Sequence, residues 1–152
     1  MNDPNSVRDL LKNLFASQRF AVLATQGGGQ PYGSLVAFAA DDDLGRLFFA
    51  TARGTRKYRN LAADSRVALV VDSRSNREED LQDAVAVTAV GEARELPAAE
   101  RDAPLDLMLA RHPSLGAFLR DPDAALVSLR VDTYCLVSRF EDVVEFRPAS
   151  RS

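Results

Sequence analysis

Residues 48–61 read Phe-Phe-Ala-Thr-Ala-Arg-Gly-Thr-Arg-Lys-Tyr-Arg-Asn-Leu, an apolar strand pattern followed by a glycine turn and a short helix pattern. Thr55 suits the N-cap position because its hydroxyl can accept a hydrogen bond from the first helical turn. Apolar residues then recur at helical spacing. We therefore expect a helix from about Arg56 to Ala63, with one apolar face turned toward a core.

The first turn of this helix carries positive charge, from Arg56, Lys57 and Arg59, with Arg53 just ahead. Free N–H groups already make a helix start positive, so this position favours Asp or Glu by about 0.3–1 kcal/mol per charge. A bound anion would compensate, since N–H groups, a threonine hydroxyl and several cations together suit a phosphate. The alternative is a solvated basic turn with its side chains extended into water. The charge pattern alone does not decide between the two.

Length and composition narrow the class of protein. A chain of 152 residues suits one domain, 1–152, and its 46% apolar and 27% charged residues are ordinary for a globular protein. A net charge of −3 argues against nucleic-acid binding, and the uncharged apolar runs are too short for a membrane span. The single Cys135 and the absence of a basic head before residue 5 lead us to expect a cytoplasmic protein without a signal peptide.

The remaining patterns predict a mainly β (α+β) fold, an antiparallel Greek-key barrel of six or seven strands with short flanking helices. A polar loop at 73–83 can reach toward a partner, and Gly91 is expected at a β-bulge. We expect an N-terminal helix at 6–17 with Ser6 as N-cap, a barrel at 19–96, a helical insert at 97–120 and closing strands at 125–147. The expected strands are 19–25, 31–39, 46–51, 67–72 and 84–95, followed by two or three closing strands from the segments 125–131, 134–140 and 143–146.

A family resemblance rests on a set of short motifs: Pro31-Tyr32, the strand Ser34-Leu35-Val36, Phe49-Ala50-Thr51 and Thr55-Arg56-Lys57. In this order and spacing they resemble the pyridoxamine 5′-phosphate oxidase-like, FMN-binding split-barrel family. The resemblance covers residues 6–96. From Arg101 onward the chain looks more like the haem-utilisation branch of the same superfamily.

The resemblance implies a homodimer with two FMN molecules in clefts between the subunits. It implies an FMN-dependent oxidoreductase acting on a small molecule, with catalytic residues, substrate and electron donor left open. Alternatives within the same fold are a haem-binding or haem-degrading protein, and a non-catalytic dimer that binds flavin or deazaflavin. The cofactor-binding residues that it implies are Ser34, Leu35, Val36, Ala50, Thr51, Thr55, Arg56 and Lys57.

The chain departs from the oxidase at the positions that hold substrate there. The matching residues are Ser34 and Ala39 in place of Arg and Lys, Ala86 in place of Gln, and there is no Trp in the sequence. We therefore expect FMN binding without pyridoxamine phosphate oxidation.

Other chemistry has weaker support in the sequence. His112, the single histidine, is expected to cap a helix end, with haem ligation as the alternative that the resemblance suggests. Cys135 is expected in the core, one Cys and one His do not make a zinc site, and the acidic run 41–43 reads as a turn.

Overall fold

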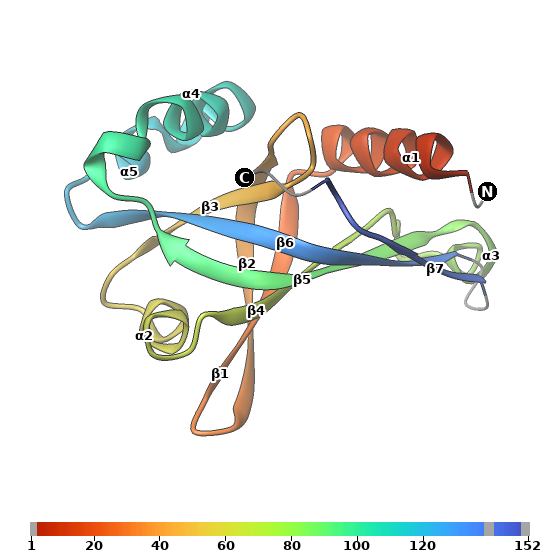
Figure 1. Ribbon diagram of the computed structural model, residues 1–152, viewed down its shortest axis with the longest axis horizontal. Coiled ribbons are helices and arrows are strands. Elements are labelled where there is room, and N and C mark those ends of the chain that lie inside the picture. Colours follow the sequence, from red (N-terminus) through yellow and green to blue (C-terminus); the bar gives the residue numbers. More distant parts are fainter. Residues whose placement is uncertain (1–2, 139–141, 150–152) are drawn as a thin grey trace.

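The computed structural model describes residues 3–138 and 142–149. In these residues seven strands form one sheet, and the helices lie at the N-terminus and in connections between strands (Figure 1). The elements are α1 (Pro4–Ser17), β1 (Phe20–Gly27), β2 (Gln30–Ala40), β3 (Arg46–Ala52), α2 (Arg56–Ala63), β4 (Arg66–Asp72), α3 (Asp80–Asp83), β5 (Val85–Glu95), η1 (Ala98–Glu100), α4 (Asp102–Arg111), η2 (Pro113–Leu115), α5 (Gly116–Arg120), β6 (Ala124–Ser138) and β7 (Asp142–Phe146).

The strand order is β3-β2-β1-β4-β5-β6-β7, and β3 also pairs with β6. This extra pairing closes β1 to β6 into a six-stranded barrel, while β7 extends the sheet beside the second half of β6. Each of the ladders within the described residues is antiparallel. The predicted fold class, an antiparallel split barrel with short flanking helices, is confirmed.

Of the two or three closing strands predicted, two are present, because the segments predicted at 125–131 and 134–140 are not separate strands where the structure describes them. The structure has one strand, β6, whose ladder with β5 shifts register between Val90 and Gly91. On β6 the partners change from Thr133 to Val131, which leaves Asp132 as the extra residue of a β-bulge. The bulge therefore lies between the two predicted segments, opposite Gly91, where a bulge was expected. Residues 139 and 140 lie outside the described residues.

Two other details differ from the prediction. Helix α1 begins at Pro4, because the Asp3 side chain caps it by accepting from the Asn5 N–H at 3.4 Å. Proline suits this first position since its missing N–H would have no helical partner there. The predicted loop at 73–83 ends in the short helix α3. The other elements begin and end close to the predicted bounds.

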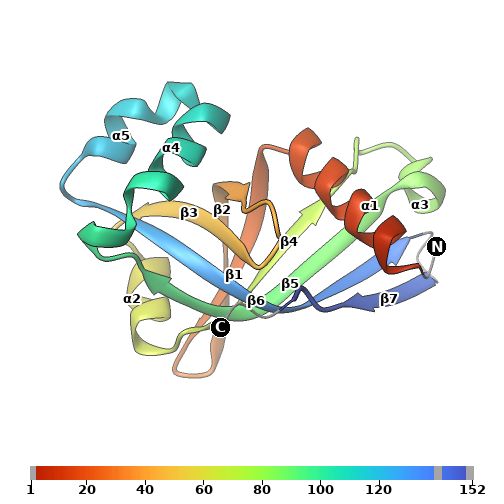
Figure 2. The ribbon, with the colours of Figure 1, turned by 45° about the horizontal axis from the view of Figure 1, so that its top comes forward.

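The main core fills the barrel, and α1 contributes Val7, Leu11, Leu14 and Phe15 to it. A second cluster lies under α4 and α5, and it contains Ala39, Phe48, Leu96, Met108, Leu119 and Leu126. The helical insert therefore covers part of the outside of the barrel (Figure 2).

A tight backbone approach at the bulge yields a stability prediction. A Cβ built on Gly91 would lie 1.9 Å from the Arg130 carbonyl oxygen, whereas one on Gly33 would meet the Val22 side chain at an ordinary 3.7 Å. Gly91→Ala is expected to lower the free energy of unfolding by at least about 2 kcal/mol, because backbone must move. Gly33→Ala, the matched strand control, should stay within about 1 kcal/mol of the wild type. Denaturant unfolding of both variants measures the difference, and equal stabilities would contradict the prediction.

Candidate functional site

The candidate site lies where β2 and β3 separate. The β2–β3 ladder joins Phe38–Ala40 to Leu47–Phe49, and the described residues show no further pairing between these strands. Beyond the Phe38–Phe49 pair, on the side away from the β2–β3 turn, β2 pairs with β1 alone as a hairpin. On the same side β3 stays paired with β6 as far as Ala52. The separation is visible below the barrel, where the β1–β2 hairpin projects away from β3 and α2 lies to the side (Figure 1). A seam opens between the two strands.

The predicted site residues fall on both sides of this seam. Ser34, Leu35 and Val36 lie on β2 and Ala50 and Thr51 lie on β3, beyond the last pair of the ladder. Val36 is 5% exposed, whereas Leu35 is 69% exposed and points to the outer face of the sheet. The structure therefore does not bring the Leu35 side chain to the residues predicted to hold phosphate.

Two threonine hydroxyls meet beneath the start of α2. Thr51 Oγ1 and Thr55 Oγ1 share a hydrogen bond of 2.8 Å, and Thr51 is buried. Thr55 is the N-cap of α2, as predicted, and its hydroxyl oxygen accepts from the Tyr58 N–H at 3.3 Å. This pairing fixes the end of β3 against the first turn of the helix.

Two cations of this turn have no acidic partner among the described residues. No salt bridge involving Arg56 or Lys57 is present within residues 3–138 and 142–149. The Arg56 guanidinium carbon lies 4.8 Å from the ring centroid of Tyr32 on β2. The backbone N–H groups of both residues belong to the first turn, which has no intrahelical acceptor for them. Two positive side chains and two free donors thus stand beside the seam.

The other two cations of the predicted cluster have different partners, so the expected convergence is only partly correct. Arg53 Nη2 lies 2.6 Å from Glu95 Oε2, and its Nη1 donates to the Pro122 carbonyl at 2.6 Å. Arg59 donates to the Gly54 carbonyl at 2.8 Å and so caps its own turn. Sequence reasoning missed Glu95, which is 42 residues from Arg53 and gave no local signal.

Glu95 anchors α2 to the end of β5 through two neighbours. The Tyr58 hydroxyl donates to Glu95 Oε1 at 2.6 Å, an oxygen that also accepts from Arg53 Nε at 3.4 Å. The hydrogen bond from Arg53, supported by that from Tyr58, holds the pKa of Glu95 below its ordinary value. The same carboxylate raises the pKa of the Tyr58 phenol. Glu95 is therefore a charged acceptor that fixes the basic turn in place.

The β1–β2 hairpin is attached to one face of α2. Asn60 Nδ2 donates to the Thr25 hydroxyl at 3.1 Å, and Gln26 Nε2 donates to the Asp64 carboxylate. Gly27 leaves room for this approach, because a Cβ there would lie 2.5 Å from the Asn60 side-chain oxygen. Sequence analysis missed these contacts, although the spacing of 56, 60 and 64 places their side chains on one helix face.

His112 lies away from the seam, in the cluster under the helical insert. It occupies the C-cap position of α4 and is 4% exposed, but its backbone N–H and not its ring bonds to the last turn, at the Met108 carbonyl. Its Nε2 lies 2.8 Å from the Phe38 carbonyl oxygen, to which it donates because a carbonyl only accepts. Haem ligation through Nε2 would require this hydrogen bond to break.

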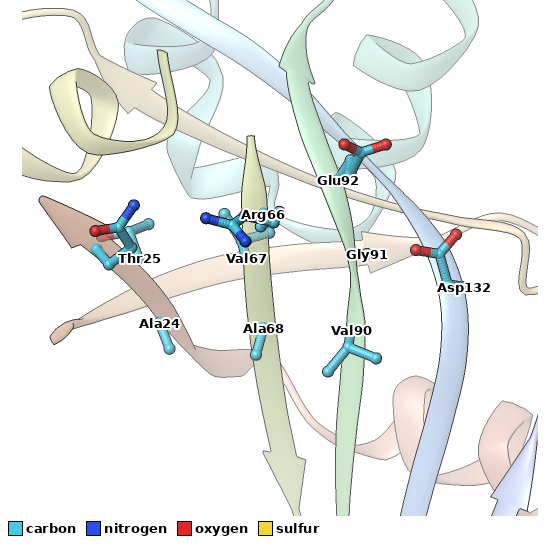
Figure 3. Close-up of a pocket in the computed structure, with 10 residues that line it drawn as sticks. Ala24, Thr25, Arg66, Val67, Ala68, Val90, Gly91, Glu92 and Asp132 are labelled. Atoms are coloured by element: carbon cyan, nitrogen blue, oxygen red, sulfur yellow. The ribbon is translucent and has the colours of Figure 1, made fainter. Parts of the chain in front are cut away.

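The outer face of the sheet is apolar between the hairpin and β5. Side chains directly opposite in antiparallel ladders share a face, which places Phe20, Val22, Leu35, Val70, Ala68 and Val90 together. A hollow of about 550 Å³ lies here, and Ala24, Ala68 and Val90 line it side by side on neighbouring strands (Figure 3). Arg66, Glu92 and Asp132 stand around it. None of the predicted phosphate-binding residues lines this hollow.

The described part of the chain was compared with what a metal site and a membrane-spanning helix require. No group of three or more His, Cys, Asp or Glu side chains gathers there to hold a metal ion. In the acidic turn, Asp41 pairs with Arg46 at 3.1 Å, and Asp43 accepts from the Gly45 N–H at 2.9 Å. Among the helices of residues 3–138 and 142–149, none has the length and apolarity needed to cross a membrane.

Comparisons with known proteins agree on the fold. The family model described as pyridoxamine 5′-phosphate oxidase matches residues 7–137. No curated protein matches the sequence. The haem binding protein from Mycobacterium smegmatis is similar in structure, with a TM-score of 0.81 and 22% identity over 92% of this chain and 57% of that one. The chain thus spans just over half the length of that protein.

Two further solved structures show the same architecture. General Stress Protein 26 from Bacillus anthracis has a TM-score of 0.72 and 19% identity, over 93% of this chain and 98% of that chain. A FAD-binding protein from Mesorhizobium loti has a TM-score of 0.63 and 20% identity, over 82% of this chain and 89% of that chain. At these identities the likeness establishes the fold.

The barrel is closed by the pairing of β3 with β6, and it is split between β2 and β3, with a basic helix start beside the split. This arrangement is that of a split-barrel protein. Because the family model matches most of its length, the chain belongs to the pyridoxamine 5′-phosphate oxidase family.

The Glu95 cluster predicts a pH-dependent contribution to stability. Because the pKa of Glu95 is lower in the folded protein, its ion pair stabilises the fold above the unfolded-state pKa of about 4.3. That stabilisation is lost as the pH falls through the folded-state pKa. Glu95→Gln is therefore expected to cost about 1 kcal/mol at pH 7, since both side chains are partly exposed, and to cost little at pH 3.

Urea unfolding of wild type and Glu95→Gln between pH 3 and pH 7 measures this difference. Glu78→Gln, in the exposed part of the 73–83 loop, is the control for loss of one carboxylate. A difference that stays constant with pH would contradict the account of the cluster.

Proposed function

We propose that this protein binds FMN in the seam between β2 and β3, with the phosphate at the start of α2, and acts as an oxidoreductase on a small molecule. The observation that carries the proposal is the placement of Arg56 and Lys57, free of salt bridges in the described residues, above the bonded pair Thr51 and Thr55. A phosphate there would offset the charge that opposes the helix dipole.

The residues present suit a flavin phosphate. The side chains of Arg56 and Lys57 would supply positive charge, and the N–H groups of the first turn would supply donors. The hydroxyls of Thr51 and Thr55 bond to each other and to the Ala52 carbonyl oxygen, and either would exchange one of these hydrogen bonds for a bond to the phosphate. Along residues 30–36 the β2 edge away from β1 has no strand neighbour within the described residues, so its backbone groups are available to a ring or a ribityl chain. When bound, FMN supplies the hydride or electron chemistry. The protein then needs to hold and orient it.

We also propose a homodimer in which a second copy covers the outer face of the sheet. Four large apolar residues stay exposed on this face: Phe20 at 57%, Leu35 at 69%, Val90 at 37% and Val143 at 66%. Ladder partners place them on one surface, from the hairpin across β5 to β7. A sheet face that exposes several large apolar side chains is characteristic of an interface. Since Leu35 follows Ser34 on β2, the interface would adjoin the proposed flavin site.

Haem is the second candidate ligand, supported by the similarity in fold to the haem binding protein from Mycobacterium smegmatis. A deazaflavin, whose phosphate would use the same turn, is the third. The absorption spectrum of the purified protein separates them, because bound flavin, deazaflavin and haem absorb at different wavelengths. A haem band that survives in His112→Ala would exclude His112 as the iron ligand.

The first prediction from this proposal concerns the phosphate. Arg56→Ala and Lys57→Ala are each expected to weaken FMN binding by about 1.5–3 kcal/mol, because each removes a hydrogen bond to a charged group. Lys12→Ala is the matched control, since Lys12 is exposed on α1 and is the other lysine of the sequence. Titration with FMN, followed by quenching of flavin fluorescence, gives the affinities. Unchanged FMN affinity in both Arg56→Ala and Lys57→Ala would contradict the proposed position of the phosphate.

The second prediction concerns the dimer. Leu35→Glu is expected to raise the dimer dissociation constant more than tenfold, because a carboxylate would be buried in an apolar interface without a partner. Phe118→Glu, at a residue 39% exposed on α5, is the control outside the sheet face. Light scattering after size-exclusion chromatography measures the mass of each. If Leu35→Glu remains a dimer at all concentrations, the proposed interface on the outer face of the sheet is contradicted.

A further inference from the structure

Tyr32 has no role in the proposed function so far, yet its ring lies against a residue proposed to bind phosphate. Tyr32 is on β2 near the tip of the hairpin, where Gly28 and Gly29 form the turn with positive φ. The guanidinium carbon of Arg56 lies 4.8 Å from its ring centroid, within the range of a cation–π interaction. Tyr32 is 36% exposed, so its ring is not simply a core side chain.

The place of the Tyr32 ring does not depend on Arg56. The hairpin is held to α2 one and two turns further along the helix, where Asn60 contacts Thr25 and Asp64 contacts Gln26. Thr25 lies directly opposite Tyr32 in the β1–β2 ladder, so both side chains share the face turned to α2. The ring is therefore a fixed surface beside the first turn of the helix.

A guanidinium on this surface remains able to bind a phosphate. The guanidinium has five N–H donors, and its central carbon lies 4.8 Å from the Tyr32 ring centroid. The ring accepts no more than part of this donor set, so N–H groups remain for a phosphate. Without the ring, the exposed Arg56 side chain would sample many rotamers and would lose that freedom only on binding.

We propose that Tyr32 is a positioning residue, which holds Arg56 ready for the phosphate of the flavin. This inference rests on the proposed function. The ring face carries the effect, and the phenol oxygen is not required. Phenylalanine should therefore replace Tyr32 without loss, and an aliphatic residue should not.

Titrations with FMN and with riboflavin, which lacks the phosphate, test the inference in wild type, Tyr32→Phe, Tyr32→Leu, Arg56→Ala and the double variant Tyr32→Leu/Arg56→Ala. Tyr32→Leu should weaken FMN about two- to fivefold, the range of an exposed cation–π pair, and leave riboflavin unchanged. Tyr32→Phe should bind both flavins as the wild type does. In the Arg56→Ala background, Tyr32→Leu should cost nothing further. Thermal unfolding of each variant checks that the fold is retained.

The other outcomes separate this inference from the proposed function. Equal weakening of FMN and riboflavin by Tyr32→Leu would assign Tyr32 to the flavin ring, and an additive loss in the double variant would remove its link to Arg56. Either result, or FMN binding that does not change in Tyr32→Leu, overturns the role of Tyr32 and leaves FMN binding intact. A wild-type protein that binds neither flavin overturns both proposals.

Discussion

The separation of β2 from β3 is the constraint on which the site depends. β6 pairs with β5 along one edge and with β3 along the other, and this double pairing closes the barrel. β3 therefore follows β6 to Ala52, while β2 follows β1 into the hairpin. Helix α2 lies in the connection that leaves β3, and contacts from Asn60 and Asp64 hold the hairpin beside it. The seam is thus defined by hydrogen bonds on both sides.

The four cations at the start of α2 divide into two that have partners in the structure and two that have no acidic partner in the described residues. Arg53 is neutralised by Glu95, and Arg59 caps the turn at the Gly54 carbonyl. These two residues organise the loop. Arg56 and Lys57 remain without an acidic partner in the described residues, at the helix end where positive charge is least favourable. The positive charge left over lies beside the seam, which is why we place an anionic group there.

The sequence was most informative where structure is local. The Thr55 cap and the helix after it follow from neighbouring residues, and both are present as expected. The Arg53–Glu95 pair and the Tyr32–Arg56 contact join segments far apart in the chain, and no spacing rule indicates them. Strand β6 continues through 132–133, between two predicted segments, and its bulge residue is Asp132. Its place in a bulge depends on the pairing with β5, which a single strand pattern does not contain.

Selective labelling of the two lysines tests the central claim most directly. Lys57 lies at the proposed phosphate site and Lys12 on α1, so one chain provides both the probe and its control. Acylation with an amine-reactive reagent, read by peptide mass spectrometry with and without FMN, gives the rate at each. The account predicts that FMN slows modification of Lys57 several-fold, that riboflavin does not, and that Lys12 reacts equally in all samples. Equal rates at Lys57 with and without saturating FMN would contradict it.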